Sequence, residues 1–387
     1  MNRKLLFIVN VDWFFVSHRL PIALAALQHG YEVHLGAALT GKEDALRRAG
    51  IIVHELPISR SATNLFAELL TLKAIFSLVR ELSPDIVHLV SSKAVLYGGL
   101  AARISKVPAV LASVSGLGFV FIASGFRNWF VRSAVSLLYR LALGKKNLRV
   151  IFQNPDDREL LLRLGAVTPE KALLIRGSGV DLAEYPALPE PDGVPVVAMA
   201  ARLLWDKGVG EFVAAARLLK RKGVKARFQL IGDPDPHNPA SVPSEVLASW
   251  RAEQVVEFLG FRSDIAQLFS SAHLVVLPSY REGLPRVLIE AAACGRAVVT
   301  TDVPGCRDAV IPGKTGLLVR VRDAQALADA MQSLLENSSA RQSMGLAGRH
   351  LAEESFDIRR VVDKHLAIYQ DLTCPHEAPS RPSKGAP

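Results

Sequence analysis

The feature of this chain that most constrains its fold is a regular alternation of short apolar segments with helical stretches. Such alternation is typical of parallel strands joined by crossover helices, which form a doubly wound α/β sheet. The pattern runs once over the first half and restarts after a proline-rich stretch at residues 185–195, so it predicts two Rossmann-like domains in succession. The expected strands are residues 5–9, 32–35, 51–56, 86–90 and 109–112, then 194–198, 228–231, 255–259, 274–277 and 297–301.

The length of 387 residues suits two domains of this size. We expect a first domain at residues 1–182, a linker at 183–195 and a second domain at 196–355. Residues 356–372 are expected to form a helix that packs back on the first domain, and the tail at 373–387, with its repeated Pro, Ser and Gly, to be disordered. Ligands bind outside the carboxyl ends of strands in open parallel sheets, so two facing sheets predict a reaction centre in the cleft between domains.

Charge is distributed unevenly along the chain. Residues 1–182 hold 22 Lys and Arg against 13 Asp and Glu, a difference of +9, whereas the remaining residues hold 24 of each sign. A basic first half indicates an anionic partner, and nucleic acid, a phospholipid surface and a phosphorylated substrate all qualify. No RNA-binding aromatic signature or recognition-helix motif supports nucleic acid. The three cysteines, Cys294, Cys306 and Cys374, are too few and too scattered for a disulfide framework or a zinc site, which favours the cytoplasm.

Two glutamates lie in the segment that follows an expected strand of the second domain. Pro285 suits the first position of a helix there, because its missing N–H costs nothing. The backbone of Gly283 and Leu284 precedes that helix, whose N-terminus offers free N–H groups and a positive dipole end to an anion. A carboxylate accepts two hydrogen bonds from vicinal hydroxyls, so Glu290 suits a ribose diol and Glu282 a sugar hydroxyl. Solvated surface charges are the plainer interpretation of such a pair.

Two cations, Arg202 and Lys207, follow the first expected strand of the second domain. We expect both side chains to project from the carboxyl end of that strand. Paired cations there would neutralise a diphosphate, and a guanidinium engages one bidentately. Two surface cations in a loop are the alternative. A nucleoside diphosphate needs a ribose site and a phosphate site, so the cations and the two glutamates support each other.

These cations and glutamates have the spacing of motifs in a known family. The pairing of Arg202-x4-Lys207 with Glu282-x7-Glu290 resembles the retaining family 4 glycosyltransferases of the GT-B fold, and the likeness covers residues 1–372. The resemblance implies that Glu290 binds the donor ribose, that Glu282 contacts the transferred sugar, and that the two cations bind the diphosphate of a UDP- or GDP-sugar. Further donor contacts are implied for the Gly232 turn, for the Phe261 and Arg262 backbone beside the base, and for Gly283, Leu284, Pro285 and Arg286.

Asp233 and Asp235 have the spacing of the Asp-x-Asp metal site found in a different transferase fold. Two interleaved prolines favour a turn instead, because acidic residues are common in turns by themselves. The cations Arg202 and Lys207 would neutralise the diphosphate, and the resembled family does not require a bound metal. We therefore expect no metal and no other cofactor, the nucleotide-sugar being a substrate.

In the first domain, the loop after the first strand leads towards a helix expected at residues 21–29. It carries Ser17, His18 and Arg19, which we place at the N-terminus of that helix, where an acceptor diphosphate would bind. Capping of the helix by Ser17, with an incidental His18, is the alternative.

This loop belongs to a wider resemblance to one subgroup of the family. Together with residues 116–121 and 152–157, it resembles transferases that extend sugars carried on undecaprenyl diphosphate during bacterial glycan assembly. Gly116 is therefore expected among the acceptor residues. Many family members carry a His where this chain has Ser-Val-Ser-Gly at residues 113–116. The role of that His does not transfer, and His18 is considered a partial substitute.

Residues 126–143 have the pattern of a basic amphipathic helix. Arg127, Arg132 and Arg140 lie off its apolar stripe, and Lys145 and Lys146 follow its end. Such a helix lies in the headgroup layer of a membrane, where each basic residue contributes roughly 1 kcal/mol. Because no apolar run is long enough to span a bilayer, we expect a peripheral location on the inner face of the cytoplasmic membrane, with a core-facing helix as the alternative. The stripe consists of Phe126, Trp129, Phe130, Ala134, Leu137, Leu138 and Leu141.

The leading hypothesis is retaining transfer of a sugar, an N-acetylhexosamine or a related sugar, from a UDP-sugar to a polyprenyl-diphosphate-linked saccharide. The product would belong to bacterial surface glycans such as lipopolysaccharide. Front-face departure of UDP would be assisted by Arg202, Lys207 and the helix N-terminus near Gly283. Alternatives are a transferase with a soluble acceptor, a glycoside hydrolase with Glu282 and Glu290 as acid and base, and a non-catalytic membrane-binding adaptor.

Overall fold

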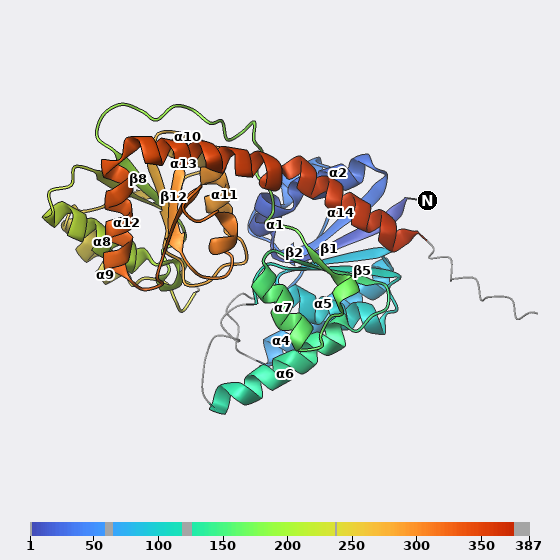
Figure 1. The fold of residues 1–387 in the computed structure, drawn as a ribbon. Helices are drawn as coiled ribbons and strands as arrows, with labels where there is room; N and C mark the ends of the chain where they lie inside the picture. Colours follow the sequence, from blue (N-terminus) through green and yellow to red (C-terminus); the bar gives the residue numbers. More distant parts are fainter. Residues whose placement is uncertain (1, 59–64, 118–125, 237, 375–387) are drawn as a thin grey trace, which may run out of the picture.

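The computed structural model describes residues 2–58, 65–117, 126–236 and 238–374, which form two α/β domains side by side (Figure 1). Within these residues the first domain holds a seven-stranded sheet of order β3-β2-β1-β4-β5-β6-β7. The second holds a six-stranded sheet of order β10-β9-β8-β11-β12-β13. Every neighbouring pair of strands is parallel. The predicted class of two doubly wound Rossmann-like sheets is therefore confirmed.

The strands of the first domain are β1 Arg3–Val11, β2 Tyr31–Ala38, β3 Ile52–Glu55, β4 Ile86–Val90, β5 Ala109–Val114, β6 Leu148–Phe152 and β7 Ala172–Leu174. Its helices are α1 Asp12–His18, α2 Leu20–Gln28, α3 Glu43–Arg48, α4 Leu65–Leu82, α5 Ser92–Ile104, α6 Phe126–Leu143 and α7 Pro155–Arg163. The second domain has strands β8 Val196–Ala200, β9 Arg227–Ile231, β10 Glu257–Gly260, β11 Leu274–Leu277, β12 Ala297–Thr301 and β13 Gly316–Val319. Its helices are α8 Val209–Arg221, α9 Ser244–Ala252, α10 Ile265–Ser270, α11 Arg286–Ala293, α12 Ala324–Glu336 and α13 Ser338–Leu351, and α14 Ile358–Thr373 follows.

The central strands are apolar because helices cover both faces of each sheet. Every residue of β4, β5, β11 and β12 is buried. Such runs lack the alternation of half-exposed strands, which is the expected pattern for a parallel sheet. Strands β6, β7 and β13 are missing from the sequence prediction because apolar runs of three to five residues are too short for periodicity to distinguish a strand from a helical segment.

The loop expected after β1 is instead the helix α1. The buried carboxylate of Asp12 begins it, accepting the N–H of Trp13 at 2.7 Å and the N–H of Thr40 at 2.7 Å. Ser17 and His18 consequently lie in the last turn of α1, and α2 begins only after them. The prediction that they occupy a helix N-terminus is wrong, because the start signal is Asp12 and its partner at residue 40 is distant in sequence.

The chain passes between the domains twice. Helix α13 continues through a π-helical turn, Ala352–Phe356, into α14, which runs across to the first domain and packs on α2, β4 and β5 (Figure 1). The other crossing meets it where Val180 pairs with Asp357. Gly179 has a φ of +80°, and a Cβ there would lie 2.8 Å from the Cα of Ile358, so only glycine fits. The tail expected to be disordered lies outside the described residues after 374.

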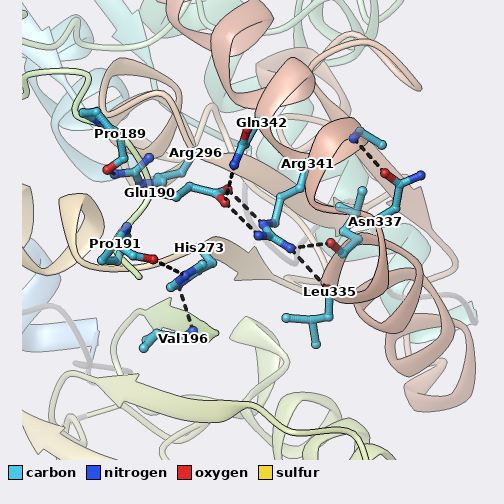
Figure 2. A network of polar contacts seen from close by, with 12 residues as sticks. Pro189, Glu190, Pro191, Val196, His273, Arg296, Leu335, Asn337, Arg341 and Gln342 are labelled. Carbon is cyan, nitrogen blue, oxygen red and sulfur yellow. Dashed lines mark hydrogen bonds and ion pairs between the residues drawn. The ribbon is translucent and has the colours of Figure 1, made fainter. Parts of the chain in front are cut away.

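The linker is fastened to the second domain by polar contacts (Figure 2). Glu190 accepts two hydrogen bonds from the guanidinium of Arg341, at 2.9 and 2.7 Å. Arg296, 2% exposed, donates to the Pro189 carbonyl at 3.2 Å. His273 Nε2 lies 2.9 Å from the Pro191 carbonyl oxygen. The proline-rich stretch is therefore part of the second domain's surface rather than a loose connection.

Helix α6 has one buried and one exposed face over the part whose side chains are described. Tyr139 and Leu143 are buried, whereas Leu137, Leu138 and Leu141 of the predicted stripe are 56%, 37% and 41% exposed. The stripe residues at 126, 129 and 130 lie outside the described side chains. Within the described part of the chain, no helix combines the length and the apolarity needed to cross a membrane.

Candidate functional site

A cavity of about 360 Å³ opens between the two domains at the carboxyl ends of β8 and β11. These two strands are where the strand order of the second sheet reverses, the position at which open α/β sheets bind ligands. The cavity is lined from the first domain by Trp13, Phe14, His18, Ser115 and Gln153, and from the second by Ala200, Ala201, Arg202, Lys207, Leu277, Glu282, Gly283, Leu284, Pro285, Arg286 and Val287.

Glu282 and Lys207 form an ion pair on the wall of the cavity. The Lys207 ammonium donates to Glu282 Oε1 at 2.5 Å, and the Ser279 hydroxyl donates to the same oxygen at 2.7 Å. Within the described residues Oε2 receives no protein hydrogen bond, so it is left for a ligand. An ammonium carries three protons, so Lys207 can hold Glu282 and still donate to a phosphate.

The lysine reaches this place because of a tight backbone approach. Gly208, directly after it, has a φ of +74°, and a Cβ there would clash with the Pro278 carbonyl. The turn Trp205–Lys207 therefore lies against the segment that leads from β11 to Glu282. Glycine is required at this point for the cation and the carboxylate to meet.

Arg202 lines the cavity and pairs with Asp235. Its Nη1 donates to Asp235 Oδ2 at 2.7 Å, and the Arg202 side chain remains 40% exposed. The Asp-containing turn thus orients the arginine. Within the described residues no group of three or more His, Cys, Asp or Glu is placed to hold a metal ion. The expectation of a metal-free reaction stays a prediction.

Glu290 lies behind the cavity rather than on its wall. It is 8% exposed, and its Oε1 accepts from the Tyr185 hydroxyl at 3.0 Å and from Arg286 Nε at 2.6 Å. Burial and the carboxylate together raise the pKa of Tyr185. Burial opposes the charged form of Arg286, but Glu290 outweighs that effect, and the pKa of Arg286 is raised overall. In the described structure Oε2 of Glu290 again has no protein partner.

The turn before α11 presents free backbone donors to the cavity. In the described part of the chain, neither the Gly283 nor the Leu284 N–H donates to a protein acceptor. Both precede α11, which begins at Arg286 with Pro285 as its N-cap. A helix N-terminus with free N–H groups is an anion-binding arrangement, so this wall suits a phosphate.

The wall from the first domain is aromatic and carries a neutral imidazole. The ring of His18 stacks on Phe14, with centroids 4.0 Å apart and planes 11° apart. The Ser17 hydroxyl lies 2.5 Å from His18 Nδ1. Burial, reinforced by Arg19 and Arg286, lowers the pKa of His18 to about 3. His18 is therefore uncharged near pH 7, and so low a pKa makes it a weak proton acceptor.

The remaining predicted acceptor residues do not line the cavity. Arg19 is 2% exposed and donates to the His18 carbonyl at 2.9 Å, so it lies beneath the wall and not on it. The prediction that Arg19 faces the acceptor is wrong, because it lies at the buried junction of α1 and α2. Ser17 contacts the site in two ways: its hydroxyl lies against His18 Nδ1, and its backbone carbonyl accepts a hydrogen bond from Arg286 Nη1, which lines the cavity. Gly116 lies beside Gly283, whose N atom would be 3.5 Å from a Cβ at residue 116.

The residues expected to read the base lie outside the cavity. Gly232 has a φ of +134° and is too close to the Ala201 carbonyl for any side chain. Phe261 is 75% exposed, and Arg262 pairs with Asp264. Gly232 donates its N–H to the Gly260 carbonyl at 2.8 Å, and Ala201, which lines the cavity, donates its N–H to the Ile231 carbonyl at 3.0 Å. Backbone hydrogen bonds therefore connect this region to the cavity wall.

Sequence reasoning missed the four cavity residues of the first domain other than His18: Trp13, Phe14, Ser115 and Gln153. The two aromatics come from the unpredicted helix α1, and Gln153 follows the unpredicted strand β6. A predicted β6 would have placed Gln153 at a strand's carboxyl end, which is the position that marks site residues in such sheets.

A phosphate-binding turn and paired cations on one Rossmann-like domain, facing a second such domain across a cleft, are the arrangement of GT-B glycosyltransferases. Comparison with known families agrees. Residues 4–154 match the family model described as "Glycosyl transferase 4-like", and residues 183–351 match "Glycosyl transferases group 1". The chain belongs to this family of glycosyltransferases. It is therefore an enzyme of the transferase class, and the hydrolase and adaptor alternatives are set aside.

Two relatives align with this chain over most of their own length. The chain is 32% identical over 366 residues to the N,N'-diacetylbacillosaminyl-diphospho-undecaprenol alpha-1,3-N-acetylgalactosaminyltransferase of Campylobacter jejuni, covering 91% of this chain and 94% of the relative. It is 26% identical over 325 residues to the UDP-Gal:alpha-D-GlcNAc-diphosphoundecaprenol alpha-1,3-galactosyltransferase of Escherichia coli, covering 80% and 81%. These two proteins are similar to this chain along most of its length.

Solved structures agree on the fold. Sucrose-phosphate synthase from Thermosynechococcus elongatus superposes with a TM-score of 0.77 at 21% identity, over 96% of this chain and 99% of that one. HepE of Anabaena, in complex with UDP and glucose, superposes with a TM-score of 0.72 at 19% identity, over 96% and 100%. At these identities the similarity establishes the GT-B fold alone.

Proposed function

We propose that this glycosyltransferase moves a sugar, an N-acetylhexosamine or a related sugar, from a UDP-sugar to a saccharide linked to polyprenyl diphosphate, with retention. The substrate class is supported by the two full-length relatives, whose names specify undecaprenyl-diphosphate-linked acceptors and N-acetylgalactosaminyl or galactosyl transfer. The product would enter bacterial surface glycan assembly.

The observation that carries the proposal is the composition of the two cavity walls. The wall from the second domain combines Arg202, Lys207 and the free N–H groups of Gly283 and Leu284, which together suit a diphosphate. Glu290 lies next to this wall with one carboxylate oxygen unused, which suits a ribose hydroxyl. The opposite wall carries no charged side chain among the described lining residues, which suits the acceptor sugar.

The two walls place the donor and the acceptor on opposite sides of the cavity, and the transfer step follows from this arrangement. The bond between the anomeric carbon and the phosphate oxygen breaks, and the acceptor hydroxyl oxygen bonds to that carbon on the same face. The hydroxyl proton passes to the departing phosphate oxygen. Negative charge developing on UDP is stabilised by the two cations and by the α11 N-terminus, interactions that strengthen as the charge grows. Glu282, the carboxylate that lines the cavity, is held by Lys207 and Ser279 and is assigned to a sugar hydroxyl.

We further propose that the first domain rests on an anionic membrane surface, where a lipid-linked acceptor is presented. The excess positive charge lies in residues 1–182. Exposed apolar side chains on α6 (Leu137, Leu138 and Leu141) and on α4 (Phe66, Leu69 and Leu70) belong to the same domain. Apolar and basic groups together are what binds a helix to a headgroup layer.

The acceptor is tested by measuring nucleotide release with two matched saccharides. Both carry the same terminal sugar, one on a short-chain polyprenyl diphosphate and the other as the free saccharide. A panel of UDP- and GDP-sugars is supplied to each. We expect release of UDP with the lipid-linked acceptor and at least a tenfold lower rate with the free one. Equal rates would show that the acceptor is soluble, and release of GDP alone would contradict the assigned nucleotide.

A further inference from the structure

Residues 153–157, Gln-Asn-Pro-Asp-Asp, follow β6 and contact the donor turn of the other domain. Asn154 is completely buried and is the N-cap of α7, because its Oδ1 accepts the Asp157 N–H at 2.8 Å. A cap needs only that oxygen. The Nδ2 group of Asn154 is used elsewhere: it donates to the Gly283 carbonyl at 2.7 Å, across the cleft between the domains.

The bond to the Gly283 carbonyl determines the orientation of a peptide group in the site. In a trans peptide the C=O and the following N–H point in opposite directions. Asn154 draws the Gly283 carbonyl towards the first domain, so the Leu284 N–H points away from it. That N–H is one of the two free donors at the head of α11.

The turn is enclosed on both sides, so its position is sensitive to the packing of the two domains. A Cβ at Gly283 would clash with the Ser115 carbonyl and would lie 2.6 Å from Gln153 Oε1, both in the first domain. From the second domain, a Cβ at Gly305 would lie 2.7 Å from the Gly283 oxygen. Neither side leaves space for the turn to shift.

A second contact joins the same segment to Arg281, which directly precedes Glu282 in the chain. Arg281 Nη2 donates to Asp157, which is fully buried and also accepts from Asn154 Nδ2 at 3.0 Å. The side chain of Arg281 is 18% exposed. Separating a largely buried ion pair leaves an uncompensated buried charge, so this contact resists opening. Asn154 and Asp157 therefore hold Gly283 and Arg281, the two neighbours of Glu282 in the chain.

We propose that Asn154 and Asp157 are positioning residues of the transfer reaction. Through Gly283 and Arg281 they hold the donor turn from the opposite domain, so that the Leu284 N–H and Glu282 face the diphosphate and the sugar of the donor. This inference rests on the proposed donor site. Its consequence is that the N–H groups that would bind the donor phosphates are fully aligned only when the two domains meet as they do here.

The test compares Asn154→Ser with Asn337→Ser. Serine is an equally good N-cap but cannot reach the Gly283 carbonyl. Asn337 caps α13 by the same contact, to the Ala340 N–H at 3.0 Å, and lies far from the cleft, so it is the matched control. Affinities for UDP and for UMP are measured by calorimetry, together with the donor turnover rate and the melting temperature.

We expect Asn154→Ser to weaken UDP binding about fivefold to tenfold and to lower kcat by at least as much, while UMP binding is unchanged. A loss confined to the nucleotide that carries the second phosphate has no explanation in general destabilisation. Asn337→Ser should change neither affinity nor rate. Equal losses for UDP and UMP, or no loss for either, would overturn the proposal.

Arg281→Gln provides a second route if the serine variant folds poorly. It should give the same loss for UDP with UMP unchanged, whereas Arg217→Gln, which removes an exposed pair with Glu253, should give none. Wild-type protein that binds neither nucleotide would contradict the proposed donor site itself. Wild-type binding of both, matched by all the variants, would contradict the positioning role alone.

Discussion

Glu282 and Glu290 are chemically identical residues with different surroundings. Glu282 lies on the cavity wall, paired with Lys207, whereas Glu290 is 8% exposed and held by Tyr185 and Arg286. Among the residues that the structure describes, the protein hydrogen bonds to both carboxylates end on Oε1, which leaves the second oxygen for a substrate hydroxyl. An acid–base pair for hydrolysis would need both carboxyl groups beside the reacting bond. Their burial therefore supports two separate ligand contacts.

Lys207 is the residue whose removal tests the charge argument most simply. Lys207→Gln should lower kcat by about 10²- to 10³-fold, because it removes a cation from the departing diphosphate. Its partner Glu282 stays at the cavity edge, so the melting temperature should fall by only a few degrees. Lys222→Gln, which removes an exposed ion pair with Asp329 on the same domain, is the control and should retain full activity. Full activity of the Lys207 variant would remove the lysine from the mechanism.

Gly283 tests how closely the two domains must approach. Gly283→Ala places a methyl group against the Ser115 carbonyl and 2.6 Å from Gln153 Oε1. One side of the cleft must move, so we expect at least a 100-fold loss of activity while UMP still binds. Gly348→Ala is the control: its Cβ would meet only ordinary contacts at 3.6 Å, and alanine favours the helix. An active Gly283→Ala enzyme would show that the observed closure is not needed.

At the scale of elements, the donor side could be predicted and the acceptor side largely could not. Helix α11 spans Arg286–Ala293 and so begins one residue after Pro285, the first helical position expected from the sequence. The agreement is close because Pro285 and the apolar run after it are local signals. Helix α1 depends on Asp12, whose partner Thr40 lies 28 residues away. Contacts of that range are invisible to periodicity. The error over α1 carried over to Arg19, which was expected at the site and is buried beneath it.

The exposed leucines of α6 make a prediction about membranes. The double variant Leu137→Glu, Leu141→Glu should lose at least tenfold of its binding to vesicles containing phosphatidylglycerol, because it places charge where apolar groups meet lipid. Leu346 on α13 is 63% exposed on the other domain, and Leu346→Glu should bind as the wild type does. Vesicle flotation measures the bound fraction. Wild-type protein that fails to float with anionic vesicles would contradict the membrane proposal.

At the scale of the whole molecule, α14 joins the second domain to the first through buried polar groups. His88 Nδ1 lies 2.7 Å from the Tyr369 hydroxyl, and His365 Nδ1 lies 2.7 Å from the Val361 carbonyl. Burial, with Arg19 close by, lowers the pKa of His365 to about 3. Burial also lowers the pKa of His88 well below its usual value. These histidines are neutral in the folded protein at neutral pH.

The lowered pKa values of these histidines predict that the stability of the fold decreases as the pH falls. The unfolded chain binds a proton on each of these histidines near pH 6.5, whereas the folded chain protonates His365 only near pH 3 and His88 only well below its usual range. Stability is therefore fully present above about pH 6.5 and falls as the pH drops below it. When the pH falls from 6 to 5, the free energy of unfolding should decrease by about 1 kcal/mol less in His365→Phe than in the wild type. Urea unfolding at the two pH values measures this difference. The exposed His29→Gln is the control, and an identical pH dependence in all three proteins would contradict the argument.

The architecture of the molecule was predictable from the chain, but the contacts between the domains were not. Two rounds of strand and helix determine two doubly wound sheets, and the parallel topology places Arg202, Lys207 and Glu282 at one sheet edge. Which residues of the first domain face them depends on how two finished domains meet. Nothing local in the sequence links Asn154 to Gly283, which lies 129 residues away, and only the assembled cleft brings the two together.

The most direct measurement of the central claim is UDP release from a UDP-sugar in the presence of a short-chain polyprenyl-diphosphate saccharide, for the wild type and for Glu290→Gln. The substitution keeps the size of a side chain that lies 3.0 Å from the Tyr185 hydroxyl, but it removes the charge that accepts from a ribose diol. We predict at least a 100-fold loss of UDP release. Undiminished release from a variant that is folded would contradict the assignment of the donor site.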